Sequence, residues 1–209
     1  KYIFTMMLEI TYGIGHFTMN HPRVLSRGLR GVIADAREKL ALLPPEEKEG
    51  DKELFYDAVI SSCTAVIAFA RRYSELAQNM AATEDDADRA AELREIARVC
   101  SRVPEHPAET LHEAIQSLYF IHLVAQIESG GNSISLGRID QVLSPYYTKD
   151  LEANRTSPEK ARELVAMLFI KTNEIWNVLE EAFIPGGEGT EGKTTQNVTV
   201  GGVGIDGKD

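Results

Sequence analysis

Apolar residues recur every three or four positions along most of the chain, which is the spacing of amphipathic helices. The first such segment covers residues 22–43 and ends at Pro44-Pro45, because proline stops a helix. Its predicted inward face consists of Val24, Leu25, Leu29, Val32, Ile33, Ala36 and Leu40. A second helix is predicted over residues 51–80, with an inward face of Leu54, Ala58, Ile60, Val66, Ile67, Phe69 and Ala70.

Helix-start signals divide the middle of the chain. Thr83 is followed by three acidic residues, which favour the positive end of a helix dipole, so a third helix is expected from there to about Val99. Further on, Thr110 and Glu113 form a capping-box signature. The segment that this box opens, residues 111–127, is dense in apolar residues, and we therefore expect a helix buried on more than one side.

The last third of the chain changes character part-way. A short helix is predicted over residues 139–152, and Ser157-Pro158 supplies an N-cap and a first-turn proline for a helix that reaches about Glu181. A glycine-rich loop follows, and then the β-branched residues 197–200 predict a strand. The fold class is therefore predicted to be mainly α with a few short β-strands.

Charge and composition exclude some classes of binding partner. The formal net charge of −10 argues against nucleic acid or an anionic membrane, because both select clustered Lys and Arg. The two cysteines form no disulfide framework, so a protein of the reducing cytoplasm is expected. No apolar run is expected to reach the length of a membrane span, and no signal peptide is visible. The start without Met and the turn-like end lead us to expect a piece of a longer protein.

The cysteines and histidines give no reason to predict a metal site. Cys63 and Cys100 lie in helical, apolar contexts and are interpreted as structural, and no Cys-x-x-Cys spacing occurs. His112 and His122 are ten residues apart, which is not the spacing of a helical metal pair, so we expect core or interface histidines. His21 is expected to cap the helix that it begins.

Three glycine-containing stretches are the candidates for a binding site. They cover residues 12–18, 128–138 and 195–202. Gly13 and Gly15 precede His16 and would let the backbone turn tightly beside it. By itself, this stretch fits an ordinary loop whose histidine has its hydrogen-bond partners within the protein. Gly130-Gly131 fits a helix C-cap, but small polar residues such as Asn132 and Ser133 crowd this helix exit and predict a pocket lining.

These motifs resemble one known family. The residues 106–118 and 126–138, together with residues 13–25 and the ending 197–207, are similar in order and spacing to glycyl radical enzymes of the pyruvate formate-lyase superfamily. The resemblance is to the glycerol dehydratase and choline lyase-like branch, and it covers nearly the whole chain. It implies that residues 1–209 are a fragment of a pyruvate formate-lyase-type domain, comprising helical wrap and the first strands of a ten-stranded α/β barrel.

The resemblance also implies a chemistry. In that family an activating enzyme with an iron–sulfur cluster and S-adenosylmethionine installs a glycyl radical, which passes to a cysteine that abstracts a substrate hydrogen. This chain has neither a Gly-Cys-Val-Glu-like nor an Arg-Val-x-Gly-Tyr-like sequence. We therefore expect no catalytic residue and no directly bound cofactor in these 209 residues, and no activity of the piece alone.

The residues that carry over are those of the substrate pocket. His16, Asn132 and Ser133 fall on substrate-contacting positions of the family, and the segment around Asn197 lines the pocket in relatives. The resemblance implies a lyase of anaerobic metabolism, a dehydratase or eliminase of a small polar substrate, which as a full-length protein is a homodimer and the partner of the activating enzyme. Two alternatives stay open: a radical carbon–carbon lyase or decarboxylase, and a non-catalytic structural or interaction module.

Overall fold

The computed structural model describes residues 17–48, 50–129, 133–175, 196–203 and 207. The chain divides into two compact units. The first, here called the helical unit, is Asn20–Phe120. The second, here called the strand unit, comprises the described parts of Lys1–Met19 and Ile121–Asp209.

The helical unit is built on one long helix. It contains α2 (His21–Ala41), the 3-10 turn η1 (Pro45–Glu47), α3 (Asp51–Thr83), α4 (Ala87–Arg102) and the first half of α5 (Leu111–Ser129). α3 packs against α2 along one part of its length and against α4 along another. An aromatic cluster joins α3 to α5 as well, because Phe69 and Tyr73 of α3 both make edge-to-face contacts with Phe120 of α5.

Gly28 lets the chain between α4 and α5 approach α2. Its backbone is left-handed, with φ +66°, and a Cβ there would lie 2.4 Å from the Glu105 carbonyl oxygen. Around this bend, the Leu29 N–H donates to the Pro104 carbonyl at 2.8 Å and the Arg30 N–H donates to the Glu105 carbonyl at 3.1 Å. Only glycine accepts both the conformation and the close contact without strain.

Two buried carboxylates tie the helices of this unit together. Glu105 accepts hydrogen bonds from Arg30 of α2 and Arg71 of α3. Glu113 accepts from Arg98 of α4 at 2.8 Å and from the Glu109 backbone N–H at 2.9 Å. The Glu113 N–H donates in turn to the Thr110 hydroxyl, so the predicted capping box forms, with its carboxylate reaching Glu109.

The strand unit joins helices to a small parallel sheet. It contains the second half of α5, β1 (Gly137–Arg138), α6 (Ile139–Glu152), α7 (Pro158–Asn173) and β2 (Val198–Thr199). β1 and β2 are parallel, with Gly137 opposite Val198 and Arg138 opposite Thr199. The Ser157 hydroxyl accepts from the Lys160 N–H at 3.2 Å, so the predicted N-cap of α7 is confirmed.

The predicted fold class is confirmed, and several boundaries need correction. Asp86 rather than Thr83 caps α4, since its carboxylate accepts from the Arg89 N–H. Asn20 rather than His21 caps α2, through its bond from the Arg23 N–H. α7 ends at Asn173, and the predicted extension beyond residue 175 lies outside the described residues. On α3, Leu54 is 66% exposed although it was predicted to face inward.

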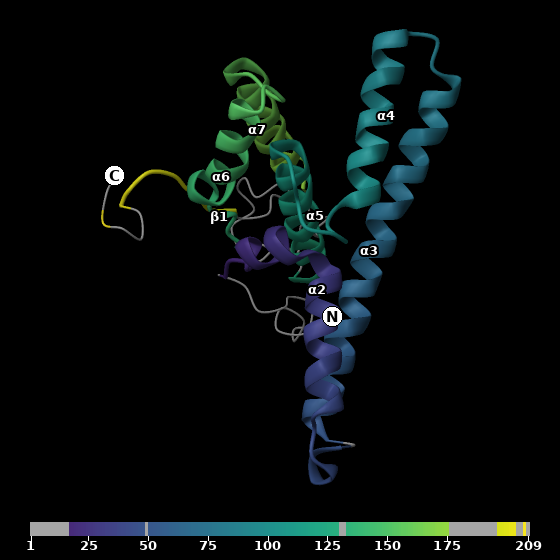
Figure 1. Cartoon of the computed structure of the whole chain (residues 1–209), viewed down its shortest axis with the longest axis vertical. Coiled ribbons are helices and arrows are strands. Elements are labelled where there is room, and N and C mark those ends of the chain that lie inside the picture. The colour runs from purple at the N-terminus through teal and green to yellow at the C-terminus, as the bar shows by residue number, and fades with distance from the viewer. Residues whose placement is uncertain (1–16, 49, 130–132, 176–195, 204–206, 208–209) are drawn as a thin grey trace, which may run out of the picture. The chain divides into compact units, whose positions relative to one another are not determined.

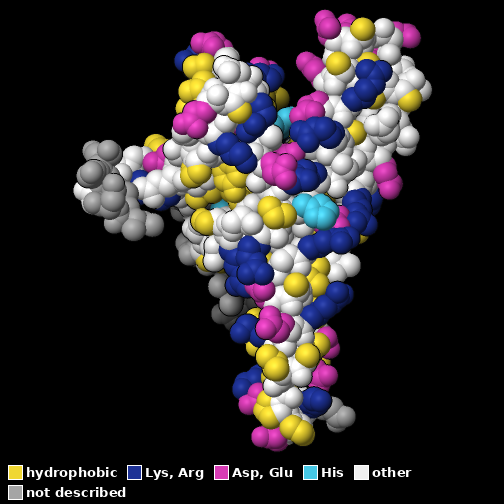
Figure 2. Space-filling view, in the orientation of Figure 1, with side chains coloured by type: hydrophobic (Ala, Val, Ile, Leu, Met, Phe, Trp, Pro, Cys, Tyr) yellow, Lys and Arg dark blue, Asp and Glu magenta, His cyan; other side chains and the backbone are white. Residues whose placement is uncertain are grey.

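The surface of the helical unit carries both positive and negative side chains. Figure 2 shows Lys and Arg side chains interspersed with Asp and Glu over this unit, with apolar side chains exposed between them. α3 is long enough to cross a membrane and contains an 18-residue window of mean hydropathy 1.4, which corrects the expectation that no apolar run would approach a span. Length and composition are weak evidence of a span, and α3 also packs against α2 and α4.

Candidate functional site

The three glycine-containing stretches meet at Ser135. The Ser135 backbone N–H donates to the Phe17 carbonyl at 2.9 Å, and Thr18 pairs with Ser135 in a parallel bridge. The Ser135 hydroxyl donates to the Asn197 carbonyl at 2.9 Å. Segments that lie 62 and 118 residues apart in the sequence are thus joined through one residue. We call this arrangement of Phe17, Thr18, Ser135 and Asn197 the Ser135 junction.

Neighbouring backbone bonds reinforce the junction. The Asn197 carbonyl accepts a second hydrogen bond, from the Leu136 N–H at 3.1 Å, and the Gly137 N–H donates to the Ser135 hydroxyl at 3.0 Å. Gly137 has φ +71°, and a Cβ on it would lie 2.7 Å from the methyl group of Thr18. The glycine therefore allows the strand after α5 to approach the segment that follows His16.

Two of the four predicted site residues lie among the described residues. Ser133 is 8% exposed and has φ +55°, a left-handed conformation that non-glycine residues adopt at a cost of about 1–2 kcal/mol. Asn197 is exposed, and its backbone carbonyl is held in the Ser135 junction. His16 and Asn132 lie outside the described residues. Each adjoins a described residue, because Phe17 follows His16 and Ser133 follows Asn132.

Arg138 and Asp140 hold the turn after β2. The Arg138 guanidinium donates to the Gly202 carbonyl at 3.1 Å and reaches the Asp140 carboxylate at 3.4 Å. The Gly201 N–H donates to Asp140 at 3.1 Å. Burial by itself raises the pKa of Asp140, but the hydrogen bonds from Arg138, Gln141 and Gly201 outweigh it and lower that pKa below its usual value. The sequence offered no sign that these two charged residues act as a pair on the Gly201-Gly202 turn.

A buried polar chain lies behind Asn197. His122 and Gln126, one turn apart on α5, are both fully buried. His122 Nε2 lies 2.5 Å from the side-chain oxygen of Gln196, and the Gln196 amide nitrogen donates to the Thr172 carbonyl at 2.8 Å, in the last turn of α7. Burial lowers the pKa of His122, so its ring is neutral at neutral pH. The prediction that His122 is a core histidine is thereby confirmed.

The described thiols are poorly suited to nucleophilic chemistry. Burial raises the pKa of Cys100 to about 11, and burial also raises the pKa of Cys63. Both are therefore thiols at neutral pH, which supports their interpretation as structural residues. Within the described ranges, no group of three or more His, Cys, Asp or Glu side chains is arranged to hold a metal ion.

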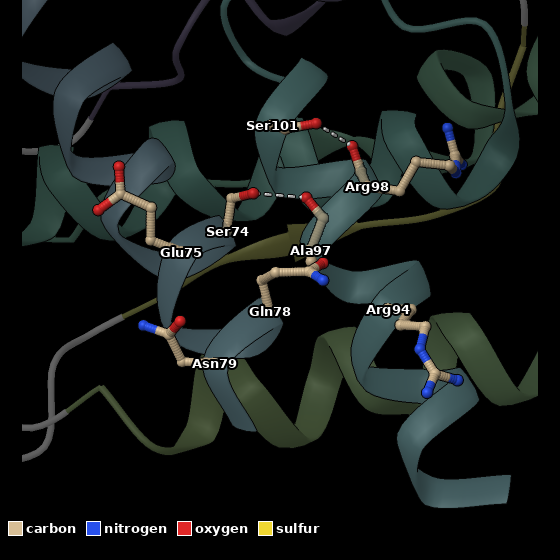
Figure 3. A pocket seen from close by; sticks show the side chains of 8 residues that line it. All are labelled: Ser74, Glu75, Gln78, Asn79, Arg94, Ala97, Arg98 and Ser101. Carbon is tan, nitrogen blue, oxygen red and sulfur yellow. Dashed lines mark hydrogen bonds between the residues drawn. The ribbon is translucent and has the colours of Figure 1, made fainter. Parts of the chain in front are cut away.

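A concave surface lies between α3 and α4 (Figure 3) and has a volume of about 560 Å³. It is wide open and polar, and it contains none of the predicted site residues. The Ser74 hydroxyl donates to the Ala97 carbonyl across it, and the Ser101 hydroxyl donates to the Arg98 carbonyl of the same helix, both at 2.7 Å. Both hydroxyls are thus used in hydrogen bonds to backbone carbonyls. We therefore interpret the groove as an ordinary surface between two packed helices.

Comparison with known proteins agrees with the motifs that meet at Ser135. The pyruvate formate lyase-like family matches residues 1–209. The chain belongs to this family. The resemblance to glycyl radical enzymes of the pyruvate formate-lyase superfamily is therefore confirmed, and the fragment is part of their fold.

Three proteins illustrate this similarity. An isethionate sulfite-lyase of Oleidesulfovibrio alaskensis is 38% identical over 154 residues, covering 72% of this chain and 19% of its own length. A structure on 1,2-propanediol dehydration in Roseburia inulinivorans shares 41% identity with a TM-score of 0.86, covering 94% of this chain and 23% of its own. The glycerol-bound B12-independent glycerol dehydratase of Clostridium butyricum shares 38% identity with a TM-score of 0.84, covering 95% and 25%. The chain thus spans about a quarter or less of the length of these relatives.

Proposed function

We propose that the whole protein carrying this sequence is a glycyl radical lyase, a dehydratase or eliminase that removes a leaving group from a small polar substrate. Three similar proteins support this class. One is named as an isethionate sulfite-lyase, one structure concerns 1,2-propanediol dehydration, and one is named as a glycerol dehydratase. In such an enzyme the glycyl radical supplies hydrogen abstraction from the substrate. The residues of this chain would bind and orient the substrate rather than react with it.

The observation that carries the proposal is the Ser135 junction. It joins the segment after His16, the segment after Asn132-Ser133 and the segment that contains Asn197, which are the three stretches predicted to line one pocket. We propose His16, Asn132, Ser133 and Asn197 as substrate-binding residues. Hydroxyl, amide and neutral imidazole groups suit a substrate with several hydroxyl groups, because each group can donate and accept hydrogen bonds.

The wider setting of the proposal follows from the family. Residues 1–209 would form helical wrap and the first strands of the barrel, and the parallel pairing of β1 with β2 supports this arrangement. The whole protein would be a cytoplasmic homodimer. Its partners would be the small-molecule substrate and an activating enzyme that uses S-adenosylmethionine and an iron–sulfur cluster.

The test uses the complete protein, loaded with its radical by the activating enzyme. It is screened anaerobically against small diols, amino alcohols, hydroxy acids and hydroxysulfonates, with product detection by mass spectrometry. Turnover of one of these with loss of water or another leaving group is the expected result. Turnover restricted to decarboxylation of an arylacetate, or to carbon–carbon cleavage, would establish the alternative lyase class, and inertness of the radical-bearing protein would favour a non-catalytic module.

A Ser133→Ala variant then tests the site. Loss of one hydrogen bond to an uncharged hydroxyl is expected to raise KM about 2- to 12-fold, because such a bond contributes about 0.5–1.5 kcal/mol. Ser144→Ala is the matched control, because Ser144 is exposed, lies within α6 and takes no part in the Ser135 junction. This variant should leave KM unchanged. Equal KM values for the two variants would remove Ser133 from the proposed site.

A further inference from the structure

His122, Gln196 and Thr172 are linked by two successive hydrogen bonds, and the Thr172 carbonyl determines which group donates in each. The Thr172 carbonyl can only accept a hydrogen bond, so the Gln196 amide nitrogen must face it, at 2.8 Å. The Gln196 side-chain oxygen therefore faces His122, whose Nε2 lies 2.5 Å away. Because that oxygen can only accept, His122 must carry its proton on Nε2.

Burial keeps the His122 ring neutral. The ring is fully buried, and burial lowers its pKa, so the form with one proton is the one present at neutral pH. Gln126 lies one helical turn further along α5, and its amide nitrogen is 3.3 Å from the same Nε2 atom. A protonated Nε2 cannot accept a hydrogen bond from that nitrogen, so this tautomer requires the Gln126 amide to present its oxygen to Nε2 instead. Among the described residues, His122 Nδ1 and the Gln126 side-chain oxygen are buried without a hydrogen-bond partner.

Gln196 connects this chain to the candidate site. It directly precedes Asn197, whose carbonyl accepts from the Ser135 hydroxyl and the Leu136 N–H. The Gln196 side chain is thus anchored to α5 and α7, while the next peptide group is anchored to the strand after α5. Anchors on both sides of one residue leave its backbone little freedom, and they fix the direction in which Asn197 is presented.

We propose that His122 and Gln196 are positioning residues that hold Asn197, and with it the β2 side of the Ser135 junction, in the orientation needed for substrate binding. In this role, the side chains of His122 and Gln196 do not contact the substrate. They act through the backbone at Asn197. In its catalytic consequence this inference rests on the proposed function, but its structural part concerns only the described residues.

Kinetics of the complete, radical-loaded protein test the catalytic part. His122→Phe keeps a ring but loses the donor, and Gln196→Met keeps the side-chain length but loses both polar contacts. Each is expected to lower kcat/KM roughly 10- to 100-fold, because small displacements of substrate-binding groups are costly, and to act mainly through KM with the radical content unchanged. His122→Gln places an amide donor near the same position and should restore most of the activity. The double variant should be no worse than Gln196→Met alone, because Gln196→Met already removes the contact that His122→Phe removes.

Backbone hydrogen exchange tests the structural part without a substrate. In His122→Phe and Gln196→Met, the amides of residues 197–203 should exchange at least about tenfold faster, since exchange reports local opening. His112→Phe, on the first turn of the same helix, is the matched control and should change neither exchange nor kinetics. Gln196 is less buried than His122, so its variant provides the same test if His122→Phe does not fold.

The outcomes separate this inference from the proposed function. If the wild-type protein turns over no substrate, the proposed function fails, and exchange at residues 197–203 alone decides the positioning role. Unchanged exchange in both variants overturns it. So does a His122→Gln variant as impaired as His122→Phe, because recovery by a second donor is what distinguishes a specific hydrogen bond from general packing.

Discussion

Two residues other than glycine adopt left-handed backbone conformations in the described parts of the chain, and they contrast in setting. Ser133, with φ +55°, is buried at the candidate site. Asn154, with φ +54°, is exposed in the turn after α6. Asparagine tolerates this conformation well, whereas serine does so less readily. A strained conformation at a buried serine beside a predicted pocket fits a role for the hydroxyl that outweighs its cost in stability.

The substitution Ser133→Gly should therefore separate stability from binding. Glycine relieves the left-handed strain, so we expect the complete protein to be stabilised by up to about 1 kcal/mol. Loss of the hydroxyl should at the same time raise KM for the substrate. Thermal unfolding and steady-state kinetics on one preparation measure both effects.

Asn154→Gly is the matched control for this prediction. It makes the same backbone change in an exposed turn, so it should alter stability by no more than a few tenths of a kcal/mol and leave KM unchanged. A Ser133→Gly variant with normal KM would show that the conformation serves the chain path alone.

At the scale of residues, the candidate site residues come from two sources. Ser133 is a candidate because small polar groups crowd the exit of an apolar helix beside glycines, whereas Asn197 is a candidate only through the family resemblance. His122 and Gln196 were missed as a pair because 74 residues separate them and neither has a local motif. Hydrogen bonds between distant segments leave no periodic pattern, so only the fold reveals them.

At the scale of elements, Glu105 is the point at which α2 and α3 are tied to the α4–α5 connection. Its side chain is 5% exposed and accepts hydrogen bonds from Arg71 and Arg30, the latter at 2.5 Å. Burial by itself raises the pKa of Glu105, but the two arginines outweigh it and hold the pKa below its usual value. The carboxylate is therefore ionised throughout the neutral range.

Glu105→Gln should lower the free energy of unfolding by about 1.5–3 kcal/mol at pH 7, the usual contribution of hydrogen bonds to a charged group. Because the folded-state pKa is depressed, this contribution is present above the unfolded glutamate pKa of about 4.3 and is lost as the pH falls through the folded value. Urea unfolding of the complete protein at pH 7 and pH 4 measures the difference, which should shrink at the lower pH.

Glu92→Gln provides the control for an exposed ion pair. Glu92 is 64% exposed and pairs with Arg89 one turn away. Its replacement should cost less than about 0.5 kcal/mol at either pH. Equal costs for the two variants would contradict the importance assigned to the buried carboxylate.

Most helices were predictable because each has strong signals at its own ends. Pro44-Pro45, the Thr110–Glu113 capping box and Ser157-Pro158 all mark boundaries that the structure confirms. β1 was missed because it has only two residues and forms through its pairing with β2, not through local propensity. The exposed Leu54 shows a different limit, since periodicity identifies an apolar face but not what covers it.

At the scale of the whole chain, large apolar side chains are exposed on several of the described elements. On α3 these include Leu54 and Phe55, and on α7 they include Met167 and Ile170. Val200, just after β2, is 65% exposed. In contrast, α5 is mostly buried, as its apolar density predicts, and only Ile127 of its apolar residues is markedly exposed.

The 209-residue chain expressed by itself is therefore expected to self-associate, because exposed apolar surface of this kind drives association in water. Sedimentation velocity should show species larger than a monomer at micromolar concentration. The double substitution Leu54→Ser with Phe55→Ser should reduce the association, whereas Glu46→Gln with Glu47→Gln in η1 should not. A stable monomer of the unsubstituted chain would contradict this expectation.

The Ser135 junction has a consequence for biosynthesis. A ribosome makes Phe17 long before Ser135, and Ser135 long before Asn197, so the junction cannot close until the last of these residues has emerged. Residues 20–120 form their own compact unit and contain mostly helices with local contacts, which fold fast. We therefore expect this unit to form first during translation, while the Ser135 junction waits for residues 196–199. Translational pausing before residue 196 would prolong the lifetime of a nascent chain that has its helices but lacks the Ser135 junction.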